Sequence, residues 1–134
     1  MKGKLLSTEV QDWQPADYRF GVAENAAAIA QEKVLSDRRS EGGGVAYLLK
    51  FTPPQGKLIR LVATALSDEH VFILEGGYCD KRGKPRRFPG DYGLNPSNHT
   101  HSAFIGQKTV ALVIYAGEPD AVHECAVIEP EAAP

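Results

Sequence analysis

The sequence predicts an all-β sandwich or barrel, and three observations carry this prediction. After residue 44 the chain consists of short runs rich in Val, Ile, Leu, Phe and Tyr, each bounded by turn-forming Gly or Pro residues. No long amphipathic helical pattern separates these runs. Many short strands without intervening helices favour antiparallel sheets over a parallel sheet with crossover helices.

The expected elements follow in chain order. Residues 1–43 are expected to form an extension, with one short helix or turn in the alanine-rich segment 21–31, because alanine has a high helix propensity. Gly42, Gly43 and Gly44 then break the chain, since consecutive glycines favour neither helix nor strand. The expected strands are Val45–Phe51, Leu58–Leu66, His70–Glu75, Thr109–Tyr115 and a last strand after Pro119.

Length and charge limit the classes of protein that this chain can belong to. Its 134 residues suit a single domain, 1–134, with a barrel core of about 44–128 after the extension. The net charge is -2 with both signs interspersed, so we expect no nucleic-acid partner. No apolar segment reaches the length of a signal peptide or of a membrane span, so no membrane partner is expected. With only two cysteines, we expect a cytoplasmic location.

Both faces of the strand expected at Leu58–Leu66 are largely apolar. One face carries Leu58, Arg60, Val62 and Thr64, and the other carries Ile59, Leu61, Ala63 and Ala65. Phe72 and Leu74 repeat the pattern on the next strand. The second apolar face must be covered by the opposite sheet, by an N-terminal segment or by another subunit. Among these we expect a homodimer that buries this outer face.

Two sets of spaced residues stand out in the second part of the chain. The first set is Gly56, Val62, Thr64, Glu69 and Gly76, and the second is Gly90, Pro96, Asn98, His101 and Ile105. Over roughly residues 44–117 these sets resemble the two motifs of the cupin superfamily. The resemblance implies a jelly-roll barrel, the double-stranded β-helix. The segment 69–77 is similar to the strand and turn that end the first motif in many small bacterial cupins. The chain therefore most resembles the small single-domain group related to the cupin domain of anti-sigma factors.

The resemblance also implies a metal site, from which this sequence departs. Cupins bind one divalent metal ion through two first-motif histidines, a glutamate and a second-motif histidine. Val62 and Thr64 stand at the first two places, so only Glu69 and His101 match the family's ligands. His99, two residues before His101, would share its face in an extended segment. Glu69, His99 and His101 would then suit Fe, Mn, Ni or Zn. The alternative is an exposed His99, a hydrogen-bonded His101 and no metal.

Arg60 shares its strand face with Thr64, and the family geometry would point it toward the barrel mouth. There its charge would need Glu69 or a bound anion as a partner, because an unpaired buried charge is costly. Alternatively, the side chain reaches water. The expected ligand-binding residues are Arg60, Thr64, Glu69, His99, His101 and Tyr47, with Phe51 and Tyr115 as further walls.

These features predict a small-molecule-binding cupin with a degenerate metal site that accepts a polar or anionic metabolite. One alternative is a metal-dependent enzyme, resembling cupin dioxygenases, isomerases or decarboxylases, in which His70 serves in proton transfer. A second alternative is a dimerisation or regulatory domain without catalysis. The sequence assigns no catalytic residue and leaves open whether the protein is an enzyme.

Overall fold

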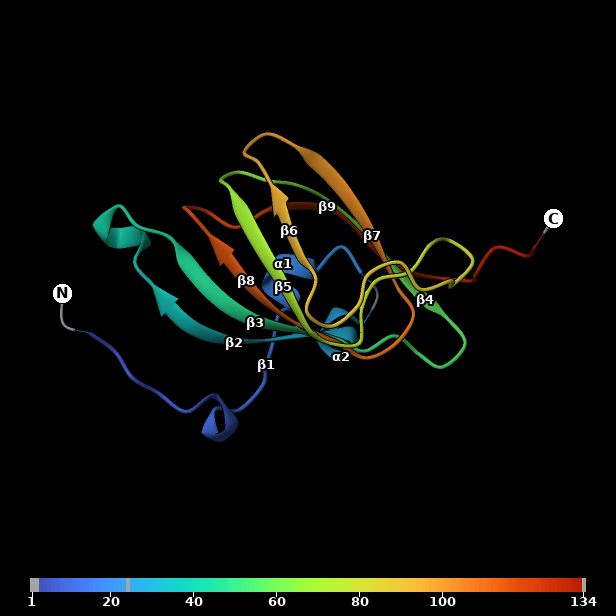
Figure 1. Cartoon of the computed structure of the whole chain (residues 1–134), viewed down its shortest axis with the longest axis horizontal. Helices are drawn as coiled ribbons and strands as arrows, with labels where there is room; N and C mark the ends of the chain where they lie inside the picture. The colour runs from blue at the N-terminus through green and yellow to red at the C-terminus, as the bar shows by residue number, and fades with distance from the viewer. Residues whose placement is uncertain (1–2, 24, 134) are drawn as a thin grey trace.

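Two antiparallel sheets face each other in the computed structural model, which describes residues 3–23 and 25–133 (Figure 1). The larger sheet has the order β1-β2-β3-β8-β5-β6, and the smaller has the order β7-β4-β9. The strands are β1 Gln14–Pro15, β2 Ala30–Asp37, β3 Val45–Phe51, β4 Leu58–Thr64, β5 Glu69–Glu75, β6 Tyr92–Asn95, β7 Thr100–Ile105, β8 Thr109–Tyr115 and β9 Ala121–Ile128. The helices are α1 Asp17–Phe20 and α2 Ala26–Ile29, with 3-10 turns at Thr8–Val10 and Arg39–Glu41.

The predicted all-β architecture is confirmed. The strands expected at Val45–Phe51 and Thr109–Tyr115 form as β3 and β8, which pair along their whole length. Buried and partly buried residues alternate along β3, as expected for a strand with one face on the core. The inner faces of the two sheets enclose a core that includes Val45, Ile59 and Ile105.

The larger sheet begins earlier in the chain than the sequence predicts. Strand β2 lies in the segment that was expected to be an extension, and it pairs with β3 from Ala30, opposite Phe51, to Asp37, opposite Val45. The helix expected over 21–31 is reduced to the single turn Ala26–Ile29. Good helix formers in β2 thus yield to pairing with a buried strand, a case of tertiary context overriding local propensity.

Helix α1 bridges the two sheets at one end of the barrel. It contacts β9 of the smaller sheet and β2 of the larger one. Phe20, at its end, is buried and packs edge-on against Phe51, with the ring centroids 5.3 Å apart. This N-terminal segment therefore contributes to the enclosure between the sheets.

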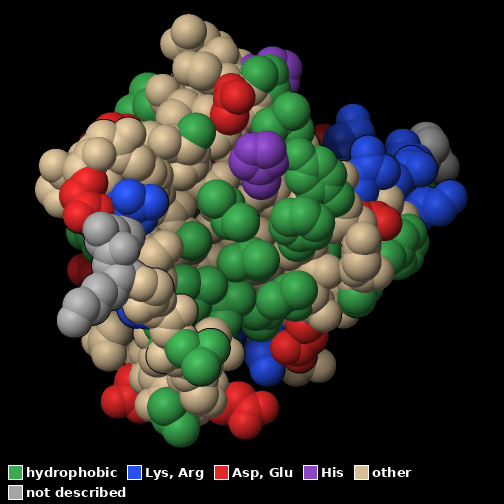
Figure 2. Space-filling model, turned by 60° about the vertical axis from the view of Figure 1, so that its left-hand side comes forward, with side chains coloured by type: hydrophobic (Ala, Val, Ile, Leu, Met, Phe, Trp, Pro, Cys, Tyr) green, Lys and Arg blue, Asp and Glu red, His purple; other side chains and the backbone are tan. Residues whose placement is uncertain are grey.

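Hydrophobic side chains gather on the outer face of the larger sheet (Figure 2). The large exposed residues there are Phe72, Leu74, Tyr92, Leu94 and Ile114, from the neighbouring strands β5, β6 and β8. Contiguous apolar patches of this kind are uncommon on monomers unless they bind something. Separately, no helix among the described residues is long and apolar enough to cross a membrane.

The homodimer stays a prediction, and this apolar face tests it. We expect the purified chain to have twice the mass of one chain in size-exclusion chromatography with light scattering. Leu74→Glu should shift it to the monomer, because a charge would be buried in the interface. Val127→Glu is the matched control, since Val127 is also exposed but lies on the smaller sheet. A monomeric wild-type protein at every concentration tested would contradict the prediction.

Candidate functional site

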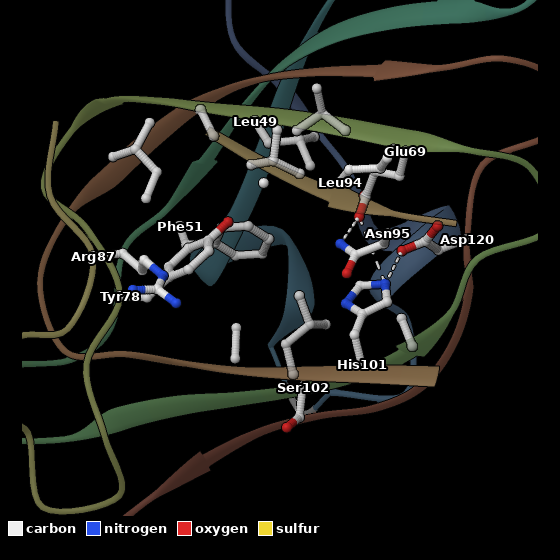
Figure 3. Close-up of a pocket in the computed structure, with 18 of the residues that line it drawn as sticks. Leu49, Phe51, Glu69, Tyr78, Arg87, Leu94, Asn95, His101, Ser102 and Asp120 are labelled. Atoms are coloured by element: carbon white, nitrogen blue, oxygen red, sulfur yellow. Dashed lines mark hydrogen bonds and ion pairs between the residues drawn. The ribbon is translucent and has the colours of Figure 1, made fainter. Parts of the chain in front are cut away.

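An internal cavity of about 310 Å³ lies between the two sheets (Figure 3). Its walls are mostly apolar and include Leu49, Phe51, Val71, Ile73, Leu61, Ala63, Ala111 and Val113. This volume is at the lower end of the range for small-molecule pockets, and apolar walls with a few polar groups are typical of them. The barrel therefore contains a cavity large enough for a small ligand.

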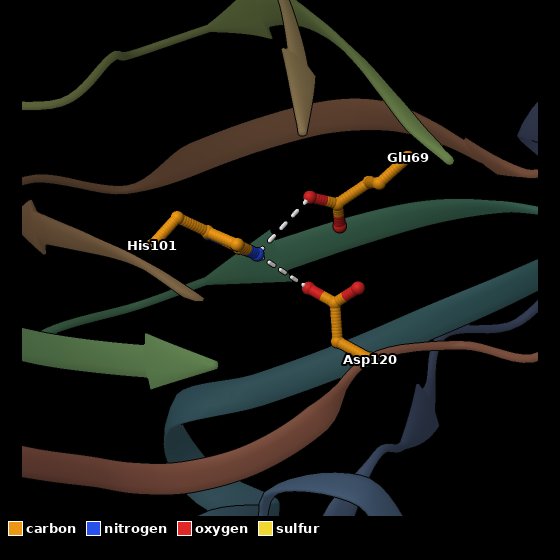
Figure 4. A group of neighbouring side chains, drawn as sticks. All are labelled: Glu69, His101 and Asp120. Carbon is orange, nitrogen blue, oxygen red and sulfur yellow. Dashed lines mark hydrogen bonds and ion pairs between the residues drawn. The ribbon is translucent and has the colours of Figure 1, made fainter. Parts of the chain in front are cut away.

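Glu69, His101 and Asp120 converge at one end of this cavity (Figure 4). His101 Nε2 lies 2.8 Å from Asp120 Oδ2 and 3.6 Å from Glu69 Oε1. Asn95 Nδ2 donates a hydrogen bond of 2.7 Å to Glu69 Oε1. Glu69 begins β5 of the larger sheet, whereas His101 lies in β7 and Asp120 directly precedes β9 of the smaller sheet. The closure of the two sheets thus assembles the cluster.

Burial and mutual charge shift the protonation equilibria of the cluster. Burial and the Asp120 charge raise the pKa of Glu69, against the opposing effects of the Asn95 hydrogen bond and the His101 charge. Burial disfavours the charged form of His101, but the Asp120 hydrogen bond and the charges of Glu69 and Asp120 outweigh it and raise the pKa of His101. Without another cation, a proton on His101 therefore compensates part of the carboxylate charge.

The same cluster has the donors that a divalent metal ion needs. One ligand atom from each of the three residues lies within 4.8 Å of the others. Asp120 Oδ1 is buried and has no hydrogen-bond partner within residues 3–23 and 25–133, so it retains a lone pair for a further ligand. Two carboxylates and one imidazole suit first-row divalent metals, and three protein ligands leave coordination positions open. The residues present therefore fit a metal ion.

The structure brings together two of the three metal ligands expected from the sequence. Glu69 and His101 meet, but His99 is exposed in the turn before β7 and lies outside the cluster. Strand β7 begins at Thr100, and His99 lies outside it, directly after Asn98, which has a φ of 71°. The extended segment that was expected to place His99 and His101 on one face therefore does not include His99. Asp120 takes the third place. Sequence reasoning missed it because it lies outside both motifs.

Arg60 and Thr64 lie on the outer side of the smaller sheet, which corrects their expected place at the ligand. Arg60 is exposed and its Nη1 lies 3.5 Å from Glu124 Oε2. Thr64 Oγ1 hydrogen bonds to Thr100 and to His123, at 2.7 and 2.6 Å. The inner face of β4 carries Leu61 and Ala63 instead, so the motif alignment selected the wrong strand face. The inner positions of this strand are apolar, and none of them carries either of the two histidines of the first cupin motif.

Tyr47 lies in a buried aromatic cluster around Arg19, outside the cavity wall. The guanidinium carbon of Arg19 stands 4.7 Å from the ring centroid of Tyr47 and 5.3 Å from that of Tyr115. Arg19 Nη2 donates a hydrogen bond of 2.7 Å to the Tyr115 hydroxyl, and Nη1 lies 3.8 Å from Glu32 Oε1. Tyr115 is directly opposite Glu69 in the sheet. Arg19 thus links helix α1 to the carboxylate end of the cavity.

The comparisons with known proteins show the fold. KdgF from Halomonas sp. has a TM-score of 0.59 and 16% identity, over 87% of this chain and 96% of that chain. An RmlC-like cupin from Shewanella frigidimarina has a TM-score of 0.60 and 12% identity, over 87% and 93%. An RmlC-like cupin protein from Ralstonia eutropha has a TM-score of 0.60 and 18% identity, over 92% and 80%. No protein-family model and no curated protein matches the chain. The predicted cupin-type jelly-roll fold is therefore confirmed by the solved structures.

The cluster predicts a specific dependence of stability on pH. Because the folded state raises the pKa of both Glu69 and His101, it favours their protonated forms. The resulting stabilisation is complete below the unfolded-state pKa values and is lost as the pH rises through the folded-state values. In EDTA, the free energy of unfolding from urea titrations should fall as the pH rises above the ordinary histidine pKa of about 6.5. His101→Gln should flatten this slope and His99→Gln should keep it. A wild-type stability that stays constant or rises above this pH would contradict the raised pKa of His101.

We expect the loss of the buried Arg19 side chain to lower the unfolding free energy far more than the loss of an exposed arginine. Its side chain is 5% exposed, so Arg19→Met leaves Glu32 buried without its cation and should cost about 3 kcal/mol of unfolding free energy. Arg39 pairs with Asp37 and Glu118 at the surface, so Arg39→Met should cost less than about 1 kcal/mol. Urea denaturation measures both values. Equal losses of unfolding free energy in the two variants would show that the buried interactions of Arg19 stabilise the fold no more than a surface ion pair does.

Proposed function

We propose that this protein is a small-molecule-binding cupin that holds a polar or anionic metabolite in its barrel cavity, next to one divalent metal ion. The observation that carries the proposal is the convergence of Glu69, His101 and Asp120 at one end of the cavity between the sheets. The site is degenerate relative to the cupin pattern, because two imidazoles are absent and Asp120 supplies a ligand from outside the motifs.

The charge of the cluster supports the metal. Two carboxylates lie together at side-chain exposures of 7% and 4%, and a single imidazole faces them. Clustered buried carboxylates are costly unless a cation compensates them, and a divalent ion does so more completely than a proton on His101. The mixed oxygen and nitrogen donors suit Fe, Mn, Ni or Zn. When bound, such an ion would polarise an oxygen atom of the ligand.

The chain's own residues would orient the ligand and exclude water. The apolar walls contributed by Leu49, Val71 and Val113 remove water from the body of the ligand. Asn95 holds Glu69 through a hydrogen bond, and Asp120 holds the ring of His101. These contacts would present a fixed polar surface to one end of the ligand.

A metal-dependent enzyme, such as a dioxygenase, isomerase or decarboxylase, is the second candidate, and one observation favours it. The His101 ring directs Nε2 toward Asp120 and its other nitrogen toward the cavity (Figure 3). If Nε2 bound the metal ion, the other ring nitrogen would carry the proton and could donate a hydrogen bond to a ligand in the cavity. His70 does not serve in proton transfer at the cavity, because it hydrogen bonds to the Tyr92 hydroxyl at the outer face.

The remaining expectations stay predictions. A non-catalytic dimerisation or regulatory role has its support in the apolar outer face of the larger sheet. The placement with the anti-sigma-factor type of cupin domain and the cytoplasmic location rest on the sequence alone.

Metal analysis of purified variants tests the proposal. Tag-free protein that has been equilibrated with Mn²⁺ and desalted should contain about one ion per chain, as measured by elemental mass spectrometry. His101→Ala and Asp120→Asn should each lower the affinity at least about tenfold, since each removes a ligand or its charge. Excess Mn²⁺ at a hundred times its dissociation constant should stabilise the wild-type fold by about 2.7 kcal/mol.

His99→Ala is the matched control, because it removes an exposed imidazole close to the cluster in sequence but outside it in space. It should leave metal occupancy unchanged. Loss of the metal in His99→Ala, together with full occupancy in Asp120→Asn, would replace Asp120 by His99 as the third ligand. Occupancy near zero in the wild type would refute the metal proposal.

A further inference from the structure

The cavity has a second charged end, opposite the carboxylate cluster. Arg87 and Tyr78 line this end beside Phe51, whereas Glu69, His101 and Asp120 lie at the other end (Figure 3). Apolar walls separate the two ends. A ligand that fills the cavity therefore meets a cation at one end and the carboxylate cluster at the other.

The backbone holds Arg87 in place at the cavity. The amides of Arg86 and Arg87 both donate to the carbonyl of Tyr78, at 2.9 and 3.1 Å. Gly77 has a φ of 144°, and a Cβ atom there would meet the Arg87 carbonyl oxygen at 2.0 Å. Only glycine allows this close approach. The loop that carries Arg87 is thus fixed against the turn that follows β5.

The guanidinium of Arg87 keeps hydrogen-bond donors for a ligand. Its one side-chain hydrogen bond within the described part of the chain runs from Nη1 to the Arg86 carbonyl, at 3.4 Å. Among the acidic residues in residues 3–23 and 25–133, none forms an ion pair with it. Asp80 instead pairs with Arg86, and Asp91 at the same end accepts a hydrogen bond from the amide of Phe88. A planar guanidinium in this state binds carboxylates well.

The other charged groups of the cavity fix the direction of an anionic ligand. Glu69 and Asp120 repel an anion from the cluster end when no metal is bound. Arg19 is engaged by Tyr115 and Glu32. The Tyr78 hydroxyl remains protonated, because burial and the charge of Glu69 raise its pKa, so it can donate a hydrogen bond. In the metal-free protein the cluster end has two carboxylates and the Arg87 end has one, that of Asp91, so electrostatic complementarity favours the anionic group at Arg87.

We propose that Arg87 and Tyr78 recognise the carboxylate of a small carboxylic acid whose apolar body fills the cavity and whose far end reaches the Glu69, His101 and Asp120 cluster. This inference rests on the proposed function of the cavity as a small-molecule site. It names the class of ligand, which the cluster of Glu69, His101 and Asp120 alone does not.

Pentanoate and its neutral analogue pentanamide test the inference, because they share a shape and differ in charge. Two-dimensional NMR titrations of the wild-type protein should give an affinity for pentanoate at least about tenfold above that for pentanamide. Arg87→Gln should abolish this preference, and Arg87→Lys should keep part of it. Arg86→Gln is the matched control and should keep all of it, since Arg86 is exposed like Arg87 but pairs with Asp80 and does not line the cavity. Well-dispersed spectra establish that each variant is folded.

The NMR signals of the cavity residues Leu49, Val71 and Ala111 distinguish a failure of the Arg87 assignment from a failure of ligand binding in the cavity. Equal affinities for both probes, with shifts of these signals, would overturn the Arg87 assignment and leave the cavity as a ligand site. A preference for pentanoate that persists in Arg87→Gln would do the same. If neither probe shifts these signals, the carboxylic-acid inference fails together with small-molecule binding in the cavity.

Discussion

The compensation of buried charge at one end of the barrel is the constraint on which the site depends. Glu69 and Asp120 come from opposite sheets, so closing the barrel brings two carboxylates together. His101 lies between them, and Arg19 reaches the same end through Tyr115. Because isolated buried charges are costly, the closed fold needs these cations. The short helix α1 therefore has an electrostatic role as well as a packing role, and a divalent ion would complete the compensation.

Strand content was predictable where the local pattern agreed with the tertiary environment. Val45–Phe51 and Thr109–Tyr115 are β-branched and aromatic runs between turn residues, and both form strands with the expected bounds. Strand β2 was not predictable in this way, because Ala30, Gln31 and Glu32 have high helix propensity. Its conformation follows from pairing with β3, a contact between segments that local patterns do not record.

The site was predictable in part, for reasons that differ between residues. Glu69 and His101 were found through the spacing of the cupin motifs. Asp120 belongs to neither motif, and only the closure of the sheets brings it to them. Arg60 was placed inside because the motif alignment selected one face of β4. Because Arg60 carries a charge, its face of β4 was the better choice for the solvent side. The opposite face, with Ile59, Ala63 and Ala65, is buried and apolar. His99 was misplaced by assuming that the extended strand includes it, whereas β7 begins at Thr100.

The central claim is that Glu69, His101 and Asp120 together hold a cation inside the barrel. The most direct measurement is a crystal grown with Mn²⁺ and examined by anomalous diffraction at the manganese absorption edge. We predict one strong peak at coordination distance from an atom of each of the three side chains. A peak at His99 or elsewhere on the surface, with none between these three residues, would contradict it.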